Sequence, residues 1–434
     1  MISSWSLDDT WIVVTGVLCA VAAALPGNFL VLRRMSMLGD AISHAVLPGL
    51  AAAFLVGGDR GGVVTIGAAV AVGIVTTLLT HWVRSSGRVD EGAAMGVVFT
   101  TLFALGLVMI VRAADDVDLD AGCVLYGAIE LTPLDTADVG GWEVPRAAVT
   151  LAVVAAVNAL LVVVCFKELK LTSFDPALAT GQGYSATAMH YALMVGVAVT
   201  AVASFEAVGN ILVVAMMIVP PAAAFLLTRR LSVMITLSVV IAAAGAAGGH
   251  VAAIVVPGWF GMPATTTAGM MAACVGGLFF LALVFSPGQG VVPRVVRKVK
   301  LSVGIVADDV VGLLYRREEQ SLAPEISAGD LSAELSASPL MTRAALSRGR
   351  RKGWVVRRGG VYALTDRGRR RARLLVRSHR LWETYLVERA DIDSSRIHPM
   401  AERYEHFTDT RLRDELAQST AADVDPHGSE IPRE

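Results

Sequence analysis

Charged residues, aromatic residues and cysteines are all scarce in this 434-residue sequence. Charged residues account for 17% and aromatic residues for 6%, whereas hydrophobic residues account for 54%. Such a composition is typical of a membrane protein and argues against an ordinary water-soluble enzyme. The four cysteines are scattered through or beside apolar runs and form no CxxC pair. Their spacing therefore argues against a disulfide framework and against a structural zinc site.

Two further absences narrow the function. No GxxxxGK[ST] motif occurs, so the chain cannot bind a nucleotide through a P-loop of its own, and ATP-driven transport would need a separate ATPase subunit. The first ten residues carry acids but no lysine or arginine, which differs from the basic start of a signal peptide. We therefore expect the first apolar run to be a retained membrane span.

The net charge of −1 conceals two different parts. Up to residue 290 there are 11 Lys/Arg against 17 Asp/Glu, and after it 26 against 21. Because almost all membrane-length runs precede residue 290, we expect a transmembrane domain over residues 1–290 and a soluble extension after it. We expect the extension to contain two domains, 291–365 and 366–434.

Nine apolar runs are long enough to cross about 30 Å of hydrocarbon. They cover residues 11–32, 40–57, 62–82, 93–111, 146–166, 188–206, 209–228, 231–256 and 264–286. Basic pairs follow the first, third, fifth and seventh runs, and short basic loops favour the cytoplasm. All four pairs fit one orientation, with the N-terminus outside and the C-terminus in the cytoplasm. Merging the sixth and seventh runs would reduce the number of spans to eight.

Several runs contain polar or helix-breaking residues. Pro26 in the first run and Pro220–Pro221 in the seventh are candidates for helix breaks, which membranes tolerate where the segment is buried in protein or lines a cavity. The outer loop 113–143 has eight acids and no base, which indicates either a mouth that concentrates cations or an ordinary solvated loop. His250 is expected to be a structural or interfacial histidine.

The second apolar run contains an acid and an imidazole. Asp40 and His44 are four residues apart and so share one face of a helix. Ionisable residues in membrane spans usually face a protein interior or a water-filled path, and this pair could hold a divalent transition metal. Alternatively, Asp40 caps the helix and His44 hydrogen-bonds a neighbouring helix. The spacing alone leaves both interpretations open.

Three stretches resemble one transporter family. Residues 39–49 (GDAISHAVLPG) resemble the signature of ABC permeases of the ZnuB/TroC/MntB type, which import zinc, manganese or iron. Residues 173–179 resemble that family's coupling segment, and 208–220 its late core span. The resemblance implies that Asp40 and His44 line the translocation path and coordinate the metal. It also implies three partners: an ABC ATPase docking near Phe174–Tyr184, an extracytoplasmic metal-binding protein, and a second permease subunit in a homodimer or heterodimer.

The basic half of the extension has the element order of a winged helix-turn-helix. Helices are predicted near 302–319, 327–335 and 339–351, and residues 354–364 alternate around a Gly-Gly turn as in a hairpin. Residues 291–380 hold 20 Lys/Arg against 8 Asp/Glu, a surface that could meet DNA phosphates. We favour a docking or dimerisation module whose arginines face anionic lipid or the ATPase, because a membrane-tethered domain meets few genomic sites.

Imidazoles and carboxylates gather in the acidic half of the extension. The candidate metal ligands are His379, Glu383, His398, Glu402, Glu405 and His406. His379 and Glu383 share one helical face, as do Glu402 and His406. Such a set without thiolate suits manganese or ferrous iron, although charged helices also bring such residues together by chance.

Residues 305–432 resemble the DtxR/MntR family of metal-dependent repressors without its optional SH3-like end. The motifs are LTDRG at 364–368, HRLWE at 379–383, residues 398–406, and DPHGSEIP at 425–432. The resemblance implies that the six candidates bind metal, and Glu402, where the iron branch has cysteine, favours manganese. Asp309 could supply a first-helix ligand, but Gly312 stands where the manganese branch has an acid. One site is therefore expected to be incomplete or weakened.

Together these features predict an all-α polytopic membrane protein with about eight or nine transmembrane helices. A cytoplasmic winged helix-turn-helix and a helical metal-binding and dimerisation domain follow it. We expect a non-enzymatic permease subunit in the bacterial cytoplasmic membrane that imports Mn²⁺, with Fe²⁺ or Zn²⁺ as alternatives, and senses the metal through its extension. The alternative is a membrane-tethered, metal-dependent transcriptional regulator, which would need no Asp40–His44 path.

Overall fold

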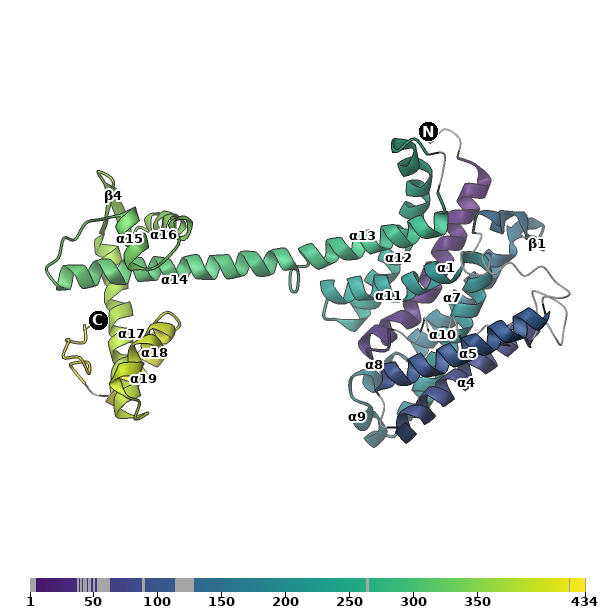
Figure 1. Ribbon diagram of the computed structural model, residues 1–434, viewed down its shortest axis with the longest axis horizontal. Helices are drawn as coiled ribbons and strands as arrows, with labels where there is room; N and C mark the ends of the chain where they lie inside the picture. Colours follow the sequence, from purple (N-terminus) through teal and green to yellow (C-terminus); the bar gives the residue numbers. More distant parts are fainter. Residues whose placement is uncertain are drawn as a thin grey trace. The chain divides into compact units, whose positions relative to one another are not determined.

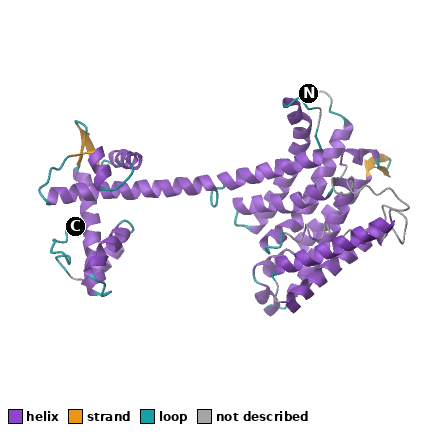
Figure 2. Cartoon of the chain, in the orientation of Figure 1, coloured by secondary structure: helices purple, strands orange, loops and turns teal. Residues whose placement is uncertain are grey.

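A computed structural model describes most of the chain. The described residues are 5–36, 39, 41, 45, 48–49, 51–52, 63–87, 90–113, 129–262, 265–420 and 422–433. They form two compact units, Met1–Pro293 and Arg294–Glu434, and helices dominate each unit (Figure 2). The division of the extension at residue 365 stays a prediction.

The first unit is a bundle of long helices with one small hairpin at its edge. Its elements are α1 (Leu7–Leu32), α4 (Val63–Gly87), α5 (Glu91–Ala113), η1 (Ile129–Leu134), β1 (Thr136–Val139), β2 (Trp142–Pro145), α7 (Arg146–Val164), α8 (Phe166–Phe174), α9 (Pro176–Gly181), α10 (Ala186–Val208), α11 (Asn210–Leu227), α12 (Leu231–Trp259) and α13 (Thr267–Phe285). Seven helices in the described part of the chain, namely α1, α5, α7, α10, α11, α12 and α13, are long and apolar enough to cross a membrane. They match seven of the predicted runs, and α4 covers the third. The all-α polytopic fold is thus confirmed, while the run at 40–57 lies largely outside the described residues.

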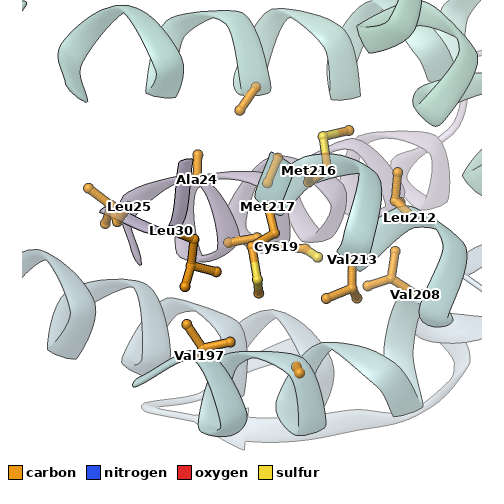
Figure 3. Close-up of a cluster of buried hydrophobic side chains, with 14 of the residues drawn as sticks. Cys19, Ala24, Leu25, Leu30, Val197, Val208, Leu212, Val213, Met216 and Met217 are labelled. Carbon is orange, nitrogen blue, oxygen red and sulfur yellow. The ribbon is translucent and has the colours of Figure 1, made fainter. Parts of the chain in front are cut away.

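Helix α1 lies inside this bundle and packs against α7, α10, α11 and α12 (Figure 1). Its buried side chains, among them Cys19 and Leu30, meet Met216 and Met217 of α11 (Figure 3). A methyl group at Gly27 would overlap the main-chain carbonyl of Met217, so only glycine permits this approach of α1 to α11. Close contact through small residues is the usual way in which membrane helices pack.

Helix α1 continues through Pro26, and α11 through Pro220 and Pro221, so the predicted helix breaks are wrong. A proline has no N–H, and Pro26 therefore leaves the carbonyl of Ala22 without its helical donor. Asn158 of α7 supplies that donor, with its Nδ2 2.9 Å from the Ala22 oxygen. Because the neighbouring helix replaces the missing hydrogen bond, α1 remains regular in the interior of the bundle.

Two residues further on, a second amide connects α1 to α12. The Nδ2 of Asn28 donates to the carbonyl of Ala24 and to Oγ of Ser238, at 2.7 Å in each case. Residues 22–28 of α1 thus contact three neighbouring helices: Ala22 accepts a hydrogen bond from α7, Asn28 donates one to α12, and Gly27 lies against the backbone of α11. We infer that this segment fixes α1 in the bundle.

The second unit contains a winged helix-turn-helix followed by a helical pair. Its elements are α14 (Val291–Glu319, whose first three residues fall in the first unit), β3 (Ile326–Ser327), α15 (Ala328–Glu334), α16 (Pro339–Arg351), β4 (Val355–Arg358), β5 (Val361–Leu364), α17 (Asp366–Glu388), α18 (Ser394–Glu405) and α19 (Thr410–Thr420). The strands form an antiparallel sheet in the order β3-β5-β4. Side chains of Ser327, Ser338 and Thr365 cap the starts of α15, α16 and α17. The predicted helices and hairpin are all present, although α14 begins earlier than expected.

Helix α17 is tied to α14 by charged pairs. Arg371 binds the carboxylate of Asp308 with two hydrogen bonds of 3.0 and 2.8 Å, and Arg369 binds Glu318 with two of 3.0 and 3.1 Å. Such bidentate pairs define the orientation of both partners. Helices α18 and α19 also pack against α17. This arrangement brings α14, α17 and α18 together around the ligand-type side chains.

Candidate metal centres

The first group of ligand-type side chains joins α17 to α18. His379 and Glu383 are one turn apart on α17, and His398 comes from α18. The Nε2 of His379 lies 3.0 Å from Oε1 of Glu383 and 3.0 Å from Nδ1 of His398, and the last two atoms are 2.9 Å apart. Adjacent ligands of an octahedral ion with bonds of about 2.1 Å are about 3 Å apart. Two imidazoles and one carboxylate converging in this way suit Mn²⁺ or Fe²⁺.

This group is buried on the α17 side and open on the other. His379 and Glu383 are 5% and 2% exposed, whereas the side chain of His398 is 56% exposed. All three line a cavity of about 540 Å³. An ion could therefore enter without unfolding the helices.

A fourth imidazole lies beside the first group. The Nε2 of His427 is 3.8 Å from Oε1 of Glu383, and His427 lines the same cavity. Asp425 holds this loop in shape, because its Oδ1 accepts hydrogen bonds from the backbone N–H groups of His427 and Ser429. His427 belongs to the DPHGSEIP motif at 425–432 but was not among the predicted ligands.

The second group joins α14 to the end of α18. Asp309 of α14 lies 3.1 Å from Nε2 of His406, measured from its Oδ1, and Oε1 of Glu405 lies 3.6 Å from the same nitrogen. The other ring nitrogen of His406, Nδ1, is buried without a hydrogen-bond partner in the described part of the chain. Asp309, Glu405 and His406 thus form a second three-residue group. Its oxygen and nitrogen donors also suit a divalent metal.

Glu405 connects the two groups. While its Oε1 faces His406, its Oε2 lies 2.7 Å from Nδ1 of His379. Its carboxylate is 5% exposed, so water screens these contacts little. One buried carboxylate therefore contacts an imidazole of each group.

The opposite charges in these groups shift the pKa values. Burial by itself would lower the pKa of His379, but Glu383 and Glu405 outweigh it and raise this pKa to about 9. Burial would raise the pKa of Glu383, yet the His379 and His398 imidazoles lower it to about 2. In the same way Asp309 raises the pKa of His406 against the effect of burial. The carboxylates therefore make the potential at both groups negative enough to retain a cation, either a proton or a metal ion.

Five of the six predicted ligands of the extension lie in the two groups. The exception is Glu402, which is exposed on α18 and belongs to neither group. Asp309 fills the first-helix position considered in the sequence analysis, whereas Gly312 supplies no side chain. Whether these residues bind metal stays a prediction.

The predicted membrane ligands Asp40 and His44 lie outside the described residues. Arg33, seven residues before Asp40, is described and contacts the predicted coupling segment. Arg33, at the end of α1, donates from Nε to Oγ of Ser173 at 3.1 Å and from Nη2 to Oγ1 of Thr172 at 2.9 Å. The end of α1, which precedes the GDAISHAVLPG stretch, is therefore anchored to α8.

His250 lies apart from these groups, in the transmembrane unit. It is 3% exposed, and its Nε2 is 3.2 Å from Oδ1 of Asp9 at the start of α1. Nearby, the backbone N–H of Thr267 donates to Glu130 at 2.6 Å. These contacts connect α12, α1, α13 and η1 and agree with a structural role for His250.

Comparison with known proteins supports both parts of this description. Residues 10–286 match the ABC 3 transport family, and residues 365–433 match the iron dependent repressor, metal binding and dimerisation domain. The zinc transport system membrane protein TroD of Treponema pallidum is 37% identical over 359 residues, covering 82% of this chain and 96% of TroD. The manganese transport system membrane protein MntD of Bacillus subtilis is 44% identical over 208 residues, covering 48% of this chain and 70% of MntD.

A solved structure extends the comparison to the fold. A chain of PsaBC from Streptococcus pneumoniae in complex with Fab superposes with a TM-score of 0.54 and 28% identity, covering 66% of this chain and 95% of that chain. The resemblances to metal-importing ABC permeases and to metal-dependent repressors are both confirmed. The matched residues 10–286 make up more than half of the sequence and contain the long apolar helices. This multi-pass membrane protein therefore belongs to the ABC 3 transport family and carries a C-terminal domain of the iron-dependent repressor type.

Proposed function

We propose that the chain is the permease subunit of an ABC importer for a divalent transition metal ion, with Mn²⁺ preferred over Fe²⁺ and Zn²⁺, in the bacterial cytoplasmic membrane. The observation that carries this proposal is the match of residues 10–286 to the ABC 3 transport family. Relatives named as manganese and zinc transport proteins support the choice of substrate. The donor set of the extension, nitrogen and oxygen without thiolate, favours manganese.

Asp40 and His44 would be the ligands that the ion meets on its way through the membrane. A carboxylate and an imidazole replace part of the hydration shell of the ion. Conduction requires a site that binds well enough for entry and weakly enough for release. Two protein ligands meet that requirement better than a closed cage of four ligands would.

A separate ATPase subunit would drive the transport by pressing on α8 and α9. Phe174 and Leu178 on these helices are 64% and 48% exposed, which supports a partner surface at Phe174–Tyr184. Because Arg33 hydrogen-bonds Thr172 and Ser173 of α8, a displacement of α8 would reach the chain that leads into the Asp40–His44 segment. The coupling would thus pass through one guanidinium group.

Two more partners complete the importer. An extracytoplasmic metal-binding protein would deliver the ion, and a second permease subunit, identical or related, would pair with this one. The basic pairs after odd-numbered apolar runs support an orientation with the N-terminus outside and the C-terminus in the cytoplasm.

The extension would act as an internal metal sensor. His379, Glu383 and His398 would hold one regulatory ion, and Asp309, Glu405 and His406 a second. The ion supplies positive charge that substitutes for the protons of these imidazoles. Since Asp309 lies on α14 and the other ligands lie on α17, on α18 and directly after α18, binding would favour one packing of these helices. A metal can switch the protein only if it binds that packing more tightly than another.

Uptake measurements made separately for each metal ion test the proposal. Proteoliposomes containing this chain and its ATPase should take up radioactive manganese with ATP, and Asp40→Ala or His44→Ala should abolish uptake while the protein stays in the membrane. A chain ending at residue 293 should still transport but should no longer slow as internal manganese rises. Wild-type uptake by both single variants would refute the transport path, and unchanged feedback in the shortened chain would refute the sensor.

A membrane-tethered transcriptional regulator is the second candidate. It is favoured by the winged-helix order of elements and by basic side chains on α16, where Arg343, Arg350 and Arg351 are exposed. Selection of sequence-specific DNA by the full chain in nanodiscs, dependent on manganese, would support it. Binding that shows no sequence preference would leave only the docking role.

A further inference from the structure

The first three turns of α14 have an apolar face and a basic face. On a helix, side chains three and four positions apart share one face, and the valines of this segment follow that spacing while the cations fall opposite them. The valines are Val291, Val292, Val295, Val296 and Val299, and the cations are Arg294, Arg297, Lys298 and Lys300. A helix of this kind, strongly two-sided and rich in basic residues, is typical of a segment that lies in a membrane interface.

The valine face is exposed in the structure. Val291, Val295 and Val299 are 47%, 54% and 48% exposed, whereas Val310 and Leu314, later in the same helix, are 1% and 0% exposed. The later residues belong to the winged-helix core. The first three turns of α14 therefore have no such core around them, and a contiguous exposed apolar stripe indicates an interaction surface.

The position of this segment in the chain points to lipid as its partner. Five residues, 286–290, separate it from the last membrane-spanning helix α13, and five extended residues reach at most about 18 Å. The segment must therefore begin close to the membrane surface. Between Phe285 and Asp308 there is no acidic residue, so nothing on the segment itself repels an anionic surface.

We propose that residues 291–301 bind the anionic lipid surface of the membrane next to the end of α13. The valines enter the boundary between headgroups and acyl chains, and the cations contact lipid phosphates. This inference rests on the membrane-spanning nature of α13 and not on the transported metal, so the uptake experiments above can fail without affecting it.

Hydrogen exchange of the full chain in nanodiscs tests the proposal. Backbone amides of residues 291–301 should exchange about tenfold more slowly in discs containing one third phosphatidylglycerol than in discs of phosphatidylcholine alone. High salt should reduce the difference. Amides of the winged-helix core around Val310 and Leu314 should exchange equally in both discs, which also shows that the protein remains folded.

Paired variants separate the contributions of the two faces. Lys298→Gln with Lys300→Gln should remove most of the lipid dependence, whereas Arg350→Gln with Arg351→Gln, a matched loss of two exposed cations from α16, should leave it intact. Val295→Ser with Val299→Ser should remove the protection in anionic discs. Equal exchange in both lipids would overturn the proposal. Protection that is equal in both lipids but lost in the valine variant would also overturn it, in favour of a protein partner.

Discussion

The two units of this protein bury polar groups of different kinds. In the described part of the transmembrane unit, the buried polar side chains are threonine, serine and asparagine, with His250 as the one ionisable member. In the extension the buried set includes Asp308, His379, Glu383 and Glu405. Neutral amides and hydroxyls hydrogen-bond neighbouring helices at low desolvation cost, whereas a buried charge needs an opposite charge beside it. The extension can therefore respond to a cation, while the polar contacts between the described membrane helices provide structural support.

The strongest test of this comparison is the removal of Glu405. Glu405→Ala should weaken metal binding at both groups by about ten- to a hundredfold, because its two oxygens face His379 and His406. It should also lower the free energy of unfolding of the metal-free extension by about 3–5 kcal/mol, since two buried imidazoles lose their carboxylate. Calorimetric titration with manganese and thermal unfolding of the full chain measure the two effects.

Glu402→Ala is the matched control, because it removes an exposed carboxylate three residues away on the same helix. It should change metal affinity far less than Glu405→Ala does. An equal loss in the two variants would place Glu402 among the ligands and contradict the grouping seen in the structure.

The second test breaks a neutral contact in the transmembrane unit. Asn158→Ala should destabilise the bundle by about 1–3 kcal/mol, because the carbonyl of Ala22 loses its donor inside the membrane. Restoring the backbone N–H with Pro26→Ala should recover part of that loss. Denaturation of the single and double variants in detergent gives the coupling between the two positions, and strictly additive losses would show that Asn158 does not compensate for Pro26.

The third test uses pH. Because the pKa of His379 is raised from 6.5 to about 9, this imidazole carries a proton at neutral pH, and a metal must displace it. Manganese affinity should therefore rise with pH up to about 9, by about tenfold per pH unit for each proton displaced. Calorimetry in buffers of different ionisation enthalpy counts the released protons, and binding without proton release would exclude His379 as a ligand.

The same pKa shifts make the stability of the metal-free extension depend on pH. The raised pKa of His379 contributes stability that is complete below pH 6.5 and is lost as the pH rises through about 9. The lowered pKa of Glu383 contributes stability that is present above pH 4.5 and is lost as the pH falls through about 2. The contribution of these groups should thus be greatest between pH 4.5 and 6.5, a window that unfolding of the full chain at several pH values would locate.

The smallest expected effect concerns the link between the coupling segment and α1. Arg33→Gln should lower metal uptake several-fold while ATP hydrolysis by the assembled importer continues, because the hydrogen bonds to Thr172 and Ser173 are weakened. Arg33→Lys, which retains the charge but cannot donate to Thr172 and Ser173 from two fixed nitrogens, should give an intermediate uptake rate. Parallel assays of uptake and phosphate release would test this, and equal losses in both rates would contradict a coupling role.

Local sequence patterns predicted much of this structure. Apolar runs gave the membrane helices, and His379 and Glu383 could be paired because helical spacing places them on one face. The contacts of Asp309 with His406, and of His427 with Glu383, depend on how distant segments pack, which periodicity does not encode. The same holds for Pro26, which was expected to break its helix. The side chain that keeps the helix regular, Asn158, lies 136 residues beyond Ala22, and no local pattern connects the two.

The shared carboxylate of Glu405 has a consequence for the shape of the response. An ion that binds either group changes the charge that the other group experiences, so neither group can fill as an isolated site. The occupancy of the extension should then follow a single curve whose steepness differs from that of two separate isotherms. Such a curve would set the range of intracellular metal concentration over which the permease changes state.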